Sequence, residues 1–179
     1  MNEETIIEGR KAVRDLLNAP SEDCIVSGES ATSLLFYLSY ALSREVGQDE
    51  NVVVTEYDHY ANISPWPELQ RRGLVREVRF ARFNPEDGQL DVGDLASLID
   101  NRTRLVAVTG VSNGIGSKTP VPEVFQFAKD AGAYAFLDAV HMDRTFRLML
   151  TSYVAIFWCF LHTSCSVVAG VSCMDEKIF

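Results

Sequence analysis

Basic residues are scarce in this sequence, and one long stretch has no charged residue at all. The 179 residues include 16 Lys and Arg against 25 Asp and Glu, which gives a formal net charge of -9. Such a charge repels phosphates and excludes nucleic-acid binding driven by general electrostatics. Leu148–Met174 contains no charged residue and three of the four cysteines. The average composition, 47% hydrophobic and 23% charged, therefore describes two unlike pieces.

Targeting and metal-binding patterns are also missing. Residues 1–11 are polar and acidic, unlike a secretory signal, so we expect a cytoplasmic protein. The three cysteines of the uncharged stretch, Cys159, Cys165 and Cys173, are 6 and 8 residues apart. These spacings fit no standard zinc pattern, so no metal site is predicted.

The first 142 residues alternate between short apolar runs and amphipathic segments. Helices are predicted over residues 4–18, 31–45, 61–72, 91–100 and 120–131, and strands over 24–26, 51–55, 74–80, 105–109 and 134–137. Strands that alternate with helices indicate an α/β fold, a three-layer α-β-α sandwich with a mainly parallel sheet. Ligands of such sheets bind at the carboxyl ends of the strands, where polar residues deserve inspection.

Polar residues follow four of the predicted strands. Ala31 and Thr32 lie at the start of a predicted helix that follows a glycine turn. This helix start is either an anion-binding site or an ordinary capped helix. His59 can stack on a flat ring, move a proton or be structural. Asn113 can donate a hydrogen bond to a ligand oxygen. Asp138 can pair with a protonated ring nitrogen or cap a helix.

Three of these segments together resemble a known family. DHYANISPW around His59, TGVSNGIG around Asn113 and FLDAVH around Asp138 resemble the class V aminotransferases and cysteine desulfurases. These are fold-type I enzymes that use pyridoxal 5'-phosphate (PLP), and the similarity covers about residues 8–142. The resemblance implies a partial PLP-binding large domain, an amino-acid substrate and a homodimer. The implied chemistry is sulfur removal from cysteine or a related transamination or lyase reaction.

The resemblance also implies a role for each candidate residue. Ala31 and Thr32 take the positions that hold the cofactor phosphate. His59 takes the position of the ring that stacks on the pyridine and assists proton transfer, which makes it the candidate catalytic residue. Asn113 and His141 fall near the phenolic oxygen of the cofactor. Asp138 falls where a carboxylate keeps the pyridine nitrogen protonated, so that the ring can accept electrons.

The lysine to which family members attach the cofactor is not found in the written sequence. The family carries it one strand after Asp138, in a motif like DFLxxSxxKxxG. The lysines of this chain are Lys11, Lys118, Lys129 and Lys177, and none has that context. The chain as written is therefore predicted to be inactive.

A second reading frame restores the motif. Suppose that each true codon begins at the third base of a written codon, so that it joins that base to the first two bases of the next codon. The codons of Trp158 and Cys159 then give only a valine codon, and those of Phe157 and Trp158 give only leucine codons. In the same frame, Ala155–Val167 permits DFLVFSAYKLFG, which is the missing motif. This register corresponds to one net nucleotide lost near codon 142. It predicts that residues 143–179 are an out-of-frame tail and not a native domain.

Two alternatives to this interpretation remain open. Leu148–Met174 is long enough to cross a bilayer, with Tyr153 and Trp158 as interface residues, although its several hydroxyl side chains make it polar for a span. Alternatively, the chain is a non-catalytic, soluble α/β domain.

Overall fold

The fold is a seven-stranded sheet covered by helices on both faces. The computed structural model describes residues 3–17 and 19–142, and the backbone of residues 155–162 and 165–172. The helices are α1 (Glu3–Leu17), the 3-10 helix η1 (Glu22–Cys24), α2 (Ala31–Leu42), α3 (Tyr60–Ile63), α4 (Pro65–Arg71), α5 (Val92–Leu98) and α6 (Val121–Asp130). The strands are β1 (Ile25–Gly28), β2 (Asn51–Thr55), β3 (Glu77–Ala81), β4 (Thr103–Thr109), β5 (Tyr134–Asp138), β6 (Ala155–His162) and β7 (Cys165–Ser172).

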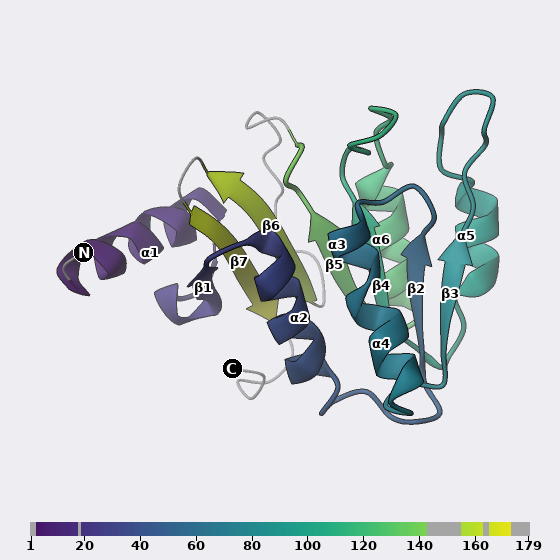
Figure 1. Cartoon of the computed structure of the whole chain (residues 1–179), viewed down its shortest axis with the longest axis horizontal. Coiled ribbons are helices and arrows are strands. Elements are labelled where there is room, and N and C mark those ends of the chain that lie inside the picture. The colour runs from purple at the N-terminus through teal and green to yellow at the C-terminus, as the bar shows by residue number, and fades with distance from the viewer. Residues whose placement is uncertain (1–2, 18, 143–154, 163–164, 173–179) are drawn as a thin grey trace.

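The strands follow the order β1-β7-β6-β5-β4-β2-β3 (Figure 1). Neighbouring strands from β3 through β6 are parallel, whereas β7 is antiparallel to both β6 and β1. The predicted α/β class with a mainly parallel sheet is therefore confirmed. Because β1 runs in the same direction as β2 to β6, the carboxyl ends of these six strands share one edge of the sheet.

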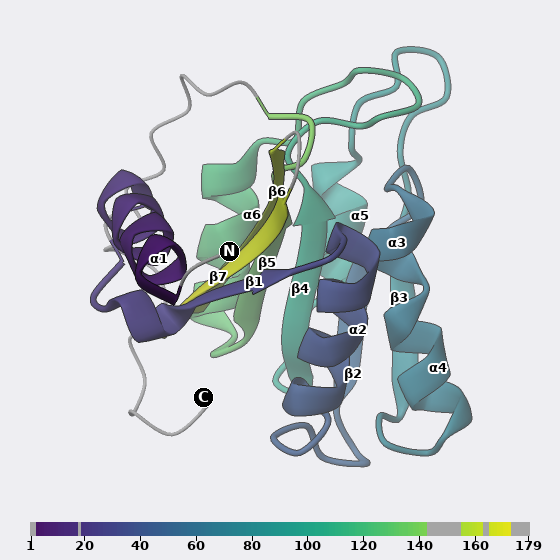
Figure 2. The ribbon, with the colours of Figure 1, turned by 60° about the vertical axis from the view of Figure 1, so that its left-hand side comes forward.

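Two apolar clusters hold the three layers together. Successive residues of a strand point to opposite faces, so Val53 and Leu137 belong to one cluster and Val52 and Phe136 to the other. The first cluster includes Phe125 of α6 and residues of α5. The second includes residues of α2 and α4. Figure 2 shows α2 and α4 on one side of the sheet and α6 with α1 on the other.

Two predicted elements differ from the structure for local reasons. The helix predicted over 61–72 is divided into α3 and α4, because Pro65 has no N–H to continue the first helix and instead begins the second. The strand predicted over 74–80 begins only at Glu77. Gly73, with φ of 70°, ends α4, and residues 74–76 turn the chain before it joins the sheet.

The uncharged stretch contributes two strands in its described parts. β6 pairs with β5 in parallel, and β7 lies between β6 and β1. Across the described ranges, which omit residues 143–154, 163–164 and 173–179, no helix combines the length and apolarity needed to cross a membrane. The membrane-span alternative therefore finds no support among the described residues.

Candidate functional site

The predicted site residues all follow strands whose carboxyl ends meet at one edge of the sheet. Ala31 and Thr32 come after β1, His59 after β2 and Asn113 after β4. Asp138 is the last residue of β5, and His141 follows it. The side-by-side order β5-β4-β2 brings three of these strand ends together directly. The topology thus gathers residues that are far apart in the sequence, as expected for a ligand site in a parallel sheet.

The segment after β1 is a capped helix start. The Ser30 hydroxyl accepts a hydrogen bond from the backbone N–H of Ser33 at 3.1 Å, so the capping interpretation is correct. Ala31 and Thr32 lie in the first turn of α2, whose amides have no intrahelical acceptors. Gly28 permits the close approach of strand and helix, because a Cβ there would lie 2.7 Å from a Leu34 methyl carbon. The cap and an anion site are compatible here, since the helix is 12 residues long and its dipole is positive at this end.

His59 is exposed but its ring is fixed. Its Nδ1 accepts a hydrogen bond from the backbone N–H of Ala61 at 3.1 Å, which caps the short helix α3. Because Nδ1 acts as an acceptor, the proton of the neutral ring lies on Nε2. The cap therefore sets both the orientation and the tautomer of the imidazole.

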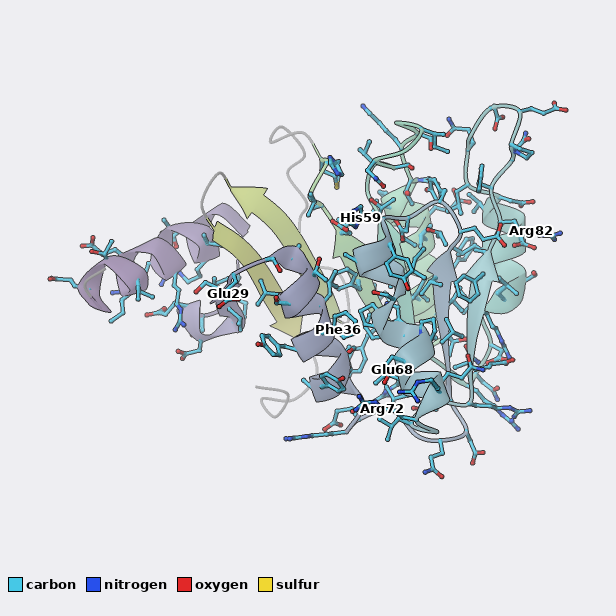
Figure 3. All side chains as sticks on the ribbon, viewed as in Figure 1. Glu29, Phe36, His59, Glu68, Arg72 and Arg82 are labelled. Carbon is cyan, nitrogen blue, oxygen red and sulfur yellow. The ribbon has the colours of Figure 1, made fainter. Side chains whose placement is uncertain are left out.

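His59 and Thr32 line one cavity of about 510 Å³ between α2 and the α3–α4 segment. Its remaining walls are Phe36, Tyr40, Tyr60, Ala61, Ser64 and Glu68. Figure 3 shows His59 near the carboxyl edge, with Phe36 and Glu68 farther along the same face. Arg71 and Arg72 form ion pairs with Glu68 and lower its pKa to about 2, so this carboxylate already has cationic partners. Asp138 is not among the lining residues, so the cavity covers only one side of the predicted site.

Asp138 is a buried carboxyl group with 5% of its surface exposed. Burial raises its pKa, while the backbone N–H of Val140, which donates to Oδ1 at 2.9 Å, lowers it. When protonated, His141 and His59 also lower it. The structure therefore brings Asp138 within electrostatic reach of both predicted histidines. Within residues 3–17 and 19–142, no Lys or Arg forms an ion pair with Asp138.

Asn113 lies on the exposed loop that follows β4. The loop is attached to the segment after β2, because the Ser112 hydroxyl donates to the backbone oxygen of Tyr57 at 2.9 Å. The hydroxyl groups of Thr119 and Tyr57 are also hydrogen-bonded. Among the described residues, no hydrogen bond joins Asn113 to the other predicted positions. Its predicted contact with a cofactor oxygen remains a prediction.

Sequence reasoning missed Asp58, a second carboxyl group at this edge. Burial is the main cause that raises its pKa to about 8, and the charge of Asp138 raises it further. Asn62 donates a side-chain hydrogen bond to its Oδ2 at 2.9 Å. An acidic residue beside a histidine in a strand-end turn is usually exposed, so the sequence carried no signal for this burial.

The sequence is similar to those of known proteins. The family model of class V aminotransferases matches residues 2–147. A cysteine desulfurase of Pectobacterium atrosepticum is 39% identical over 130 residues, which cover 72% of this chain and 31% of that protein. A cysteine desulfurase of Salmonella newport is 34% identical over 131 residues, which cover 72% of this chain and 32% of that protein.

Solved structures agree on the fold. The apo cysteine desulfurase of Thermococcus onnurineus superposes with a TM-score of 0.82 and 25% identity, covering 97% of this chain and 43% of that one. A cysteine desulfurase of Escherichia coli superposes with a TM-score of 0.79 and 24% identity, and the match covers 90% of this chain and 42% of that one.

The fold resembles part of the large domain of fold-type I PLP enzymes. The chain belongs to the class V aminotransferase family, in which it resembles the cysteine desulfurases. It spans about a third of the length of the curated relatives it matches. The family depends on PLP.

The described residues fit such a cofactor. Asp138 is a buried carboxylate that is paired with no Lys or Arg in the described part of the chain, which suits a protonated ring nitrogen. The N-terminus of α2 suits a phosphate. His59 lies in a shared cavity with Thr32, which suits a flat ring between them.

Proposed function

We propose that this chain is the cofactor-binding part of a PLP-dependent enzyme that acts on an amino acid. The proposed reaction is sulfur removal from cysteine or a related transamination or lyase reaction. The observation that carries the proposal is Asp138, a buried carboxylate at the sheet edge with two imidazoles in electrostatic reach. When bound, PLP would supply an electron sink for a carbanion of the substrate.

Each residue of the site has a proposed task that follows from its position. The first turn of α2, with Ala31 and the Thr32 hydroxyl, binds the phosphate. His59 would contact the cofactor ring and offer its Nε2 for a proton. Asp138 holds the ring nitrogen in its protonated form. By the family resemblance, Asn113 and His141 would lie near the phenolic oxygen of the cofactor.

We further propose that residues 1–142 are native and that residues 143–179 are an out-of-frame tail. One observation supports this division. The family model matches residues 2–147 and stops near the proposed lesion. β6, which overlaps the hidden motif, pairs in parallel with β5, with Cys159 opposite Asp138. This is the strand position, one after Asp138, in which the family carries its lysine.

The nucleotide sequence tests the frame proposal directly. One missing base near codon 142, followed by a shifted frame that reads DFLVFSAYKLFG, is the expected result. If the bases of Ala155–Val167 do not encode that motif in the shifted frame, the tail is not a frameshift product.

Two properties of the parent enzyme are proposed from the family resemblance. We propose that the complete enzyme is a homodimer, and that it is cytoplasmic.

Asp138→Asn tests the cofactor site. The substitution removes the negative charge that would meet the ring nitrogen, and a hydrogen bond to a charged group contributes about 1.5–3 kcal/mol. We expect the Kd for PLP, measured by fluorescence titration of the full chain, to rise about 10- to 100-fold.

Asp130→Asn is the matched control. Asp130 is an exposed carboxylate at the end of α6 whose side chain accepts a hydrogen bond from Gln126. It lies at the opposite end of its helix from the site, so the same change of charge should leave PLP affinity unaltered. Equal affinities for the wild type and Asp138→Asn would contradict the proposed site.

A further inference from the structure

Asn113 and Gly114 lie at the tip of the loop between β4 and α6, and they are the only asparagine–glycine pair in the sequence. Both residues are exposed. Within residues 3–17 and 19–142, neither the side-chain amide of Asn113 nor the backbone N–H of Gly114 has a hydrogen-bond partner. The two groups are therefore free to react with each other.

The base of this loop is fixed, in contrast to its tip. The backbone N–H of Ser112 donates to the backbone oxygen of Ser117 at 2.9 Å, and the N–H of Gly116 donates to the oxygen of Ser112 at 2.9 Å. The Ser112 hydroxyl donates to the backbone oxygen of Tyr57 at 2.9 Å. Ser112 and Ser117 are only 3% and 8% exposed. The loop thus presents its tip to solvent from a fixed base.

An asparagine followed by a glycine can lose ammonia without an enzyme. The backbone nitrogen of Gly114 gives up its proton and bonds to the side-chain carbonyl carbon of Asn113, while the bond from that carbon to the amide nitrogen breaks and ammonia leaves. Water then opens the resulting succinimide ring at either of its two carbonyls, which gives aspartate or isoaspartate. The net reaction consumes one water and releases one ammonia, so no oxidant or reductant is needed. Glycine favours the attack, because it has no Cβ to hinder the ring and its backbone is permissive.

The other asparagines that the structure describes lack one or more of these conditions. Asn84 precedes a proline, which has no N–H to lose. The backbone N–H that follows Asn101 donates to a carboxylate oxygen at 2.8 Å. Asn51 and Asn62 are each 1% exposed, and each is followed by a β-branched residue. Among the described residues, Asn113 is therefore the asparagine from which ammonia is lost most readily.

The Asp87-Gly88 pair shows how the fold can block the same ring closure. The backbone N–H of Gly88 donates to the backbone oxygen of Asn84 at 2.7 Å, and the Asp87 Oδ1 accepts from the N–H of Gln89 at 2.9 Å. Both reacting groups of this pair are thus engaged. The dipeptide alone does not single out Asn113, because the absence of such hydrogen bonds at the loop tip is also required.

We propose that Asn113 is a site of spontaneous deamidation, which replaces its neutral amide by the carboxylate of aspartate or isoaspartate. Each event adds one negative charge to the loop after β4, and the isoaspartate form also lengthens the backbone by one carbon. The reaction itself needs no cofactor. Its consequence rests on the proposed function, in which Asn113 lies near the phenolic oxygen of PLP. A carboxylate cannot donate a hydrogen bond to that oxygen and would repel its negative charge.

Deamidation is measured on the full chain without any cofactor. The protein is kept for days at mildly alkaline pH and physiological temperature, digested with trypsin and compared by mass spectrometry with a sample digested at the start. The tryptic peptide 105–118 contains Asn113 as its single asparagine. It should gain the mass of an exchange of NH2 for OH and separate into an aspartate and an isoaspartate form. The peptide 83–102, which contains Asn84, Asn101 and the Asp87-Gly88 pair, should keep its mass and its retention time.

Gly114→Ala is the matched variant. The φ of Gly114 is not positive, and a Cβ added there would lie 4.0 Å from the Ser112 hydroxyl oxygen, so the loop accommodates alanine without strain. The added methyl group hinders the attack of the backbone nitrogen. We expect deamidation of Asn113 to slow at least several-fold in this variant, while the midpoint of urea denaturation stays unchanged. Equal rates in Gly114→Ala and the wild type would overturn the proposal.

A synthetic peptide of residues 105–118 shows the rate without the fold. If this peptide deamidates while the same segment of the folded chain keeps its mass, the loop protects Asn113 and the proposal is wrong.

The consequence for the cofactor is measured separately. Asn113→Asp is the expected product, and its Kd for PLP should be several-fold higher than that of freshly prepared wild type. If Asn113 deamidates but the two Kd values are equal, the placement of Asn113 near the cofactor oxygen fails while the modification site stands. If fresh wild type binds no PLP and Asn113 still deamidates, the proposed function fails and the modification site again stands.

Discussion

Insertion of one nucleotide near codon 142 is expected to convert a chain that cannot hold PLP covalently into one that can. The restored frame places DFLVFSAYKLFG after β5, on the strand next to Asp138. The chain as written offers four lysines, and none of them lies in this motif. After incubation with PLP and reduction with borohydride, the restored chain should retain one cofactor per chain by mass spectrometry. The written chain should retain no site-specific adduct.

The control is the restored chain with the motif lysine changed to alanine, which should lose the adduct while keeping non-covalent PLP binding at the Asp138 site. Peptide mapping must locate the adduct on the motif lysine. A single reduced adduct on Lys11, Lys118, Lys129 or Lys177 of the written chain would show that the tail does not cause the loss of the lysine site.

The fold through residue 142 was predictable because its signals are local. Apolar runs such as NVVVT at 51–55 match β2 residue for residue, and all five of its residues are buried. Helix ends were less predictable, because they depend on single residues. Pro65 divides one predicted helix into α3 and α4 because it lacks an N–H. The spacing of apolar residues, from which the helix was predicted, gives no sign of this break.

The positions of the site residues were predictable from topology, but their environments were not. Parallel strands bring their carboxyl ends to one edge, so His59 and Asp138 were expected near each other. That the Oδ1 of Asp58, one residue before His59, is enclosed although the residue is only partly buried depends on the packing of Thr55, Asn62 and the end of β4 around it. Such burial arises from tertiary contacts, and no sequence period encodes it.

The pairing of β6 with β5 was not expected for a tail in the wrong frame. Written residues 155–160 are AIFWCF, and the hidden frame reads DFLVFS, so both are rich in apolar residues that suit a buried parallel strand. Strand pairing uses backbone groups, which every sequence supplies. Chemistry needs a particular side chain at one place. A shift of frame can therefore keep a strand while it removes a catalytic residue.

The largest expected loss of stability follows truncation of Trp66 on α4. It is 1% exposed, the largest of the fully buried side chains among the described residues, and it belongs to the cluster that joins α2 and α4 to the sheet. Its indole N–H donates to the backbone oxygen of Asn62 at 2.7 Å. Trp66→Ala leaves a cavity and an unpaired carbonyl, and such changes cost about 3–5 kcal/mol. Because domains are commonly stable by only about 5–15 kcal/mol, much of the fold's stability would be lost.

Urea denaturation followed by far-UV circular dichroism measures this effect. Tyr37→Ala is the control on the neighbouring helix α2, because this aromatic side chain is 69% exposed and its removal should change the free energy of unfolding by about 0.5 kcal/mol or less. Trp66→Phe should lie between the two, since it keeps most of the buried ring but not the hydrogen bond. Equal stability of Trp66→Ala and Tyr37→Ala would mean that α4 does not pack on the sheet as described.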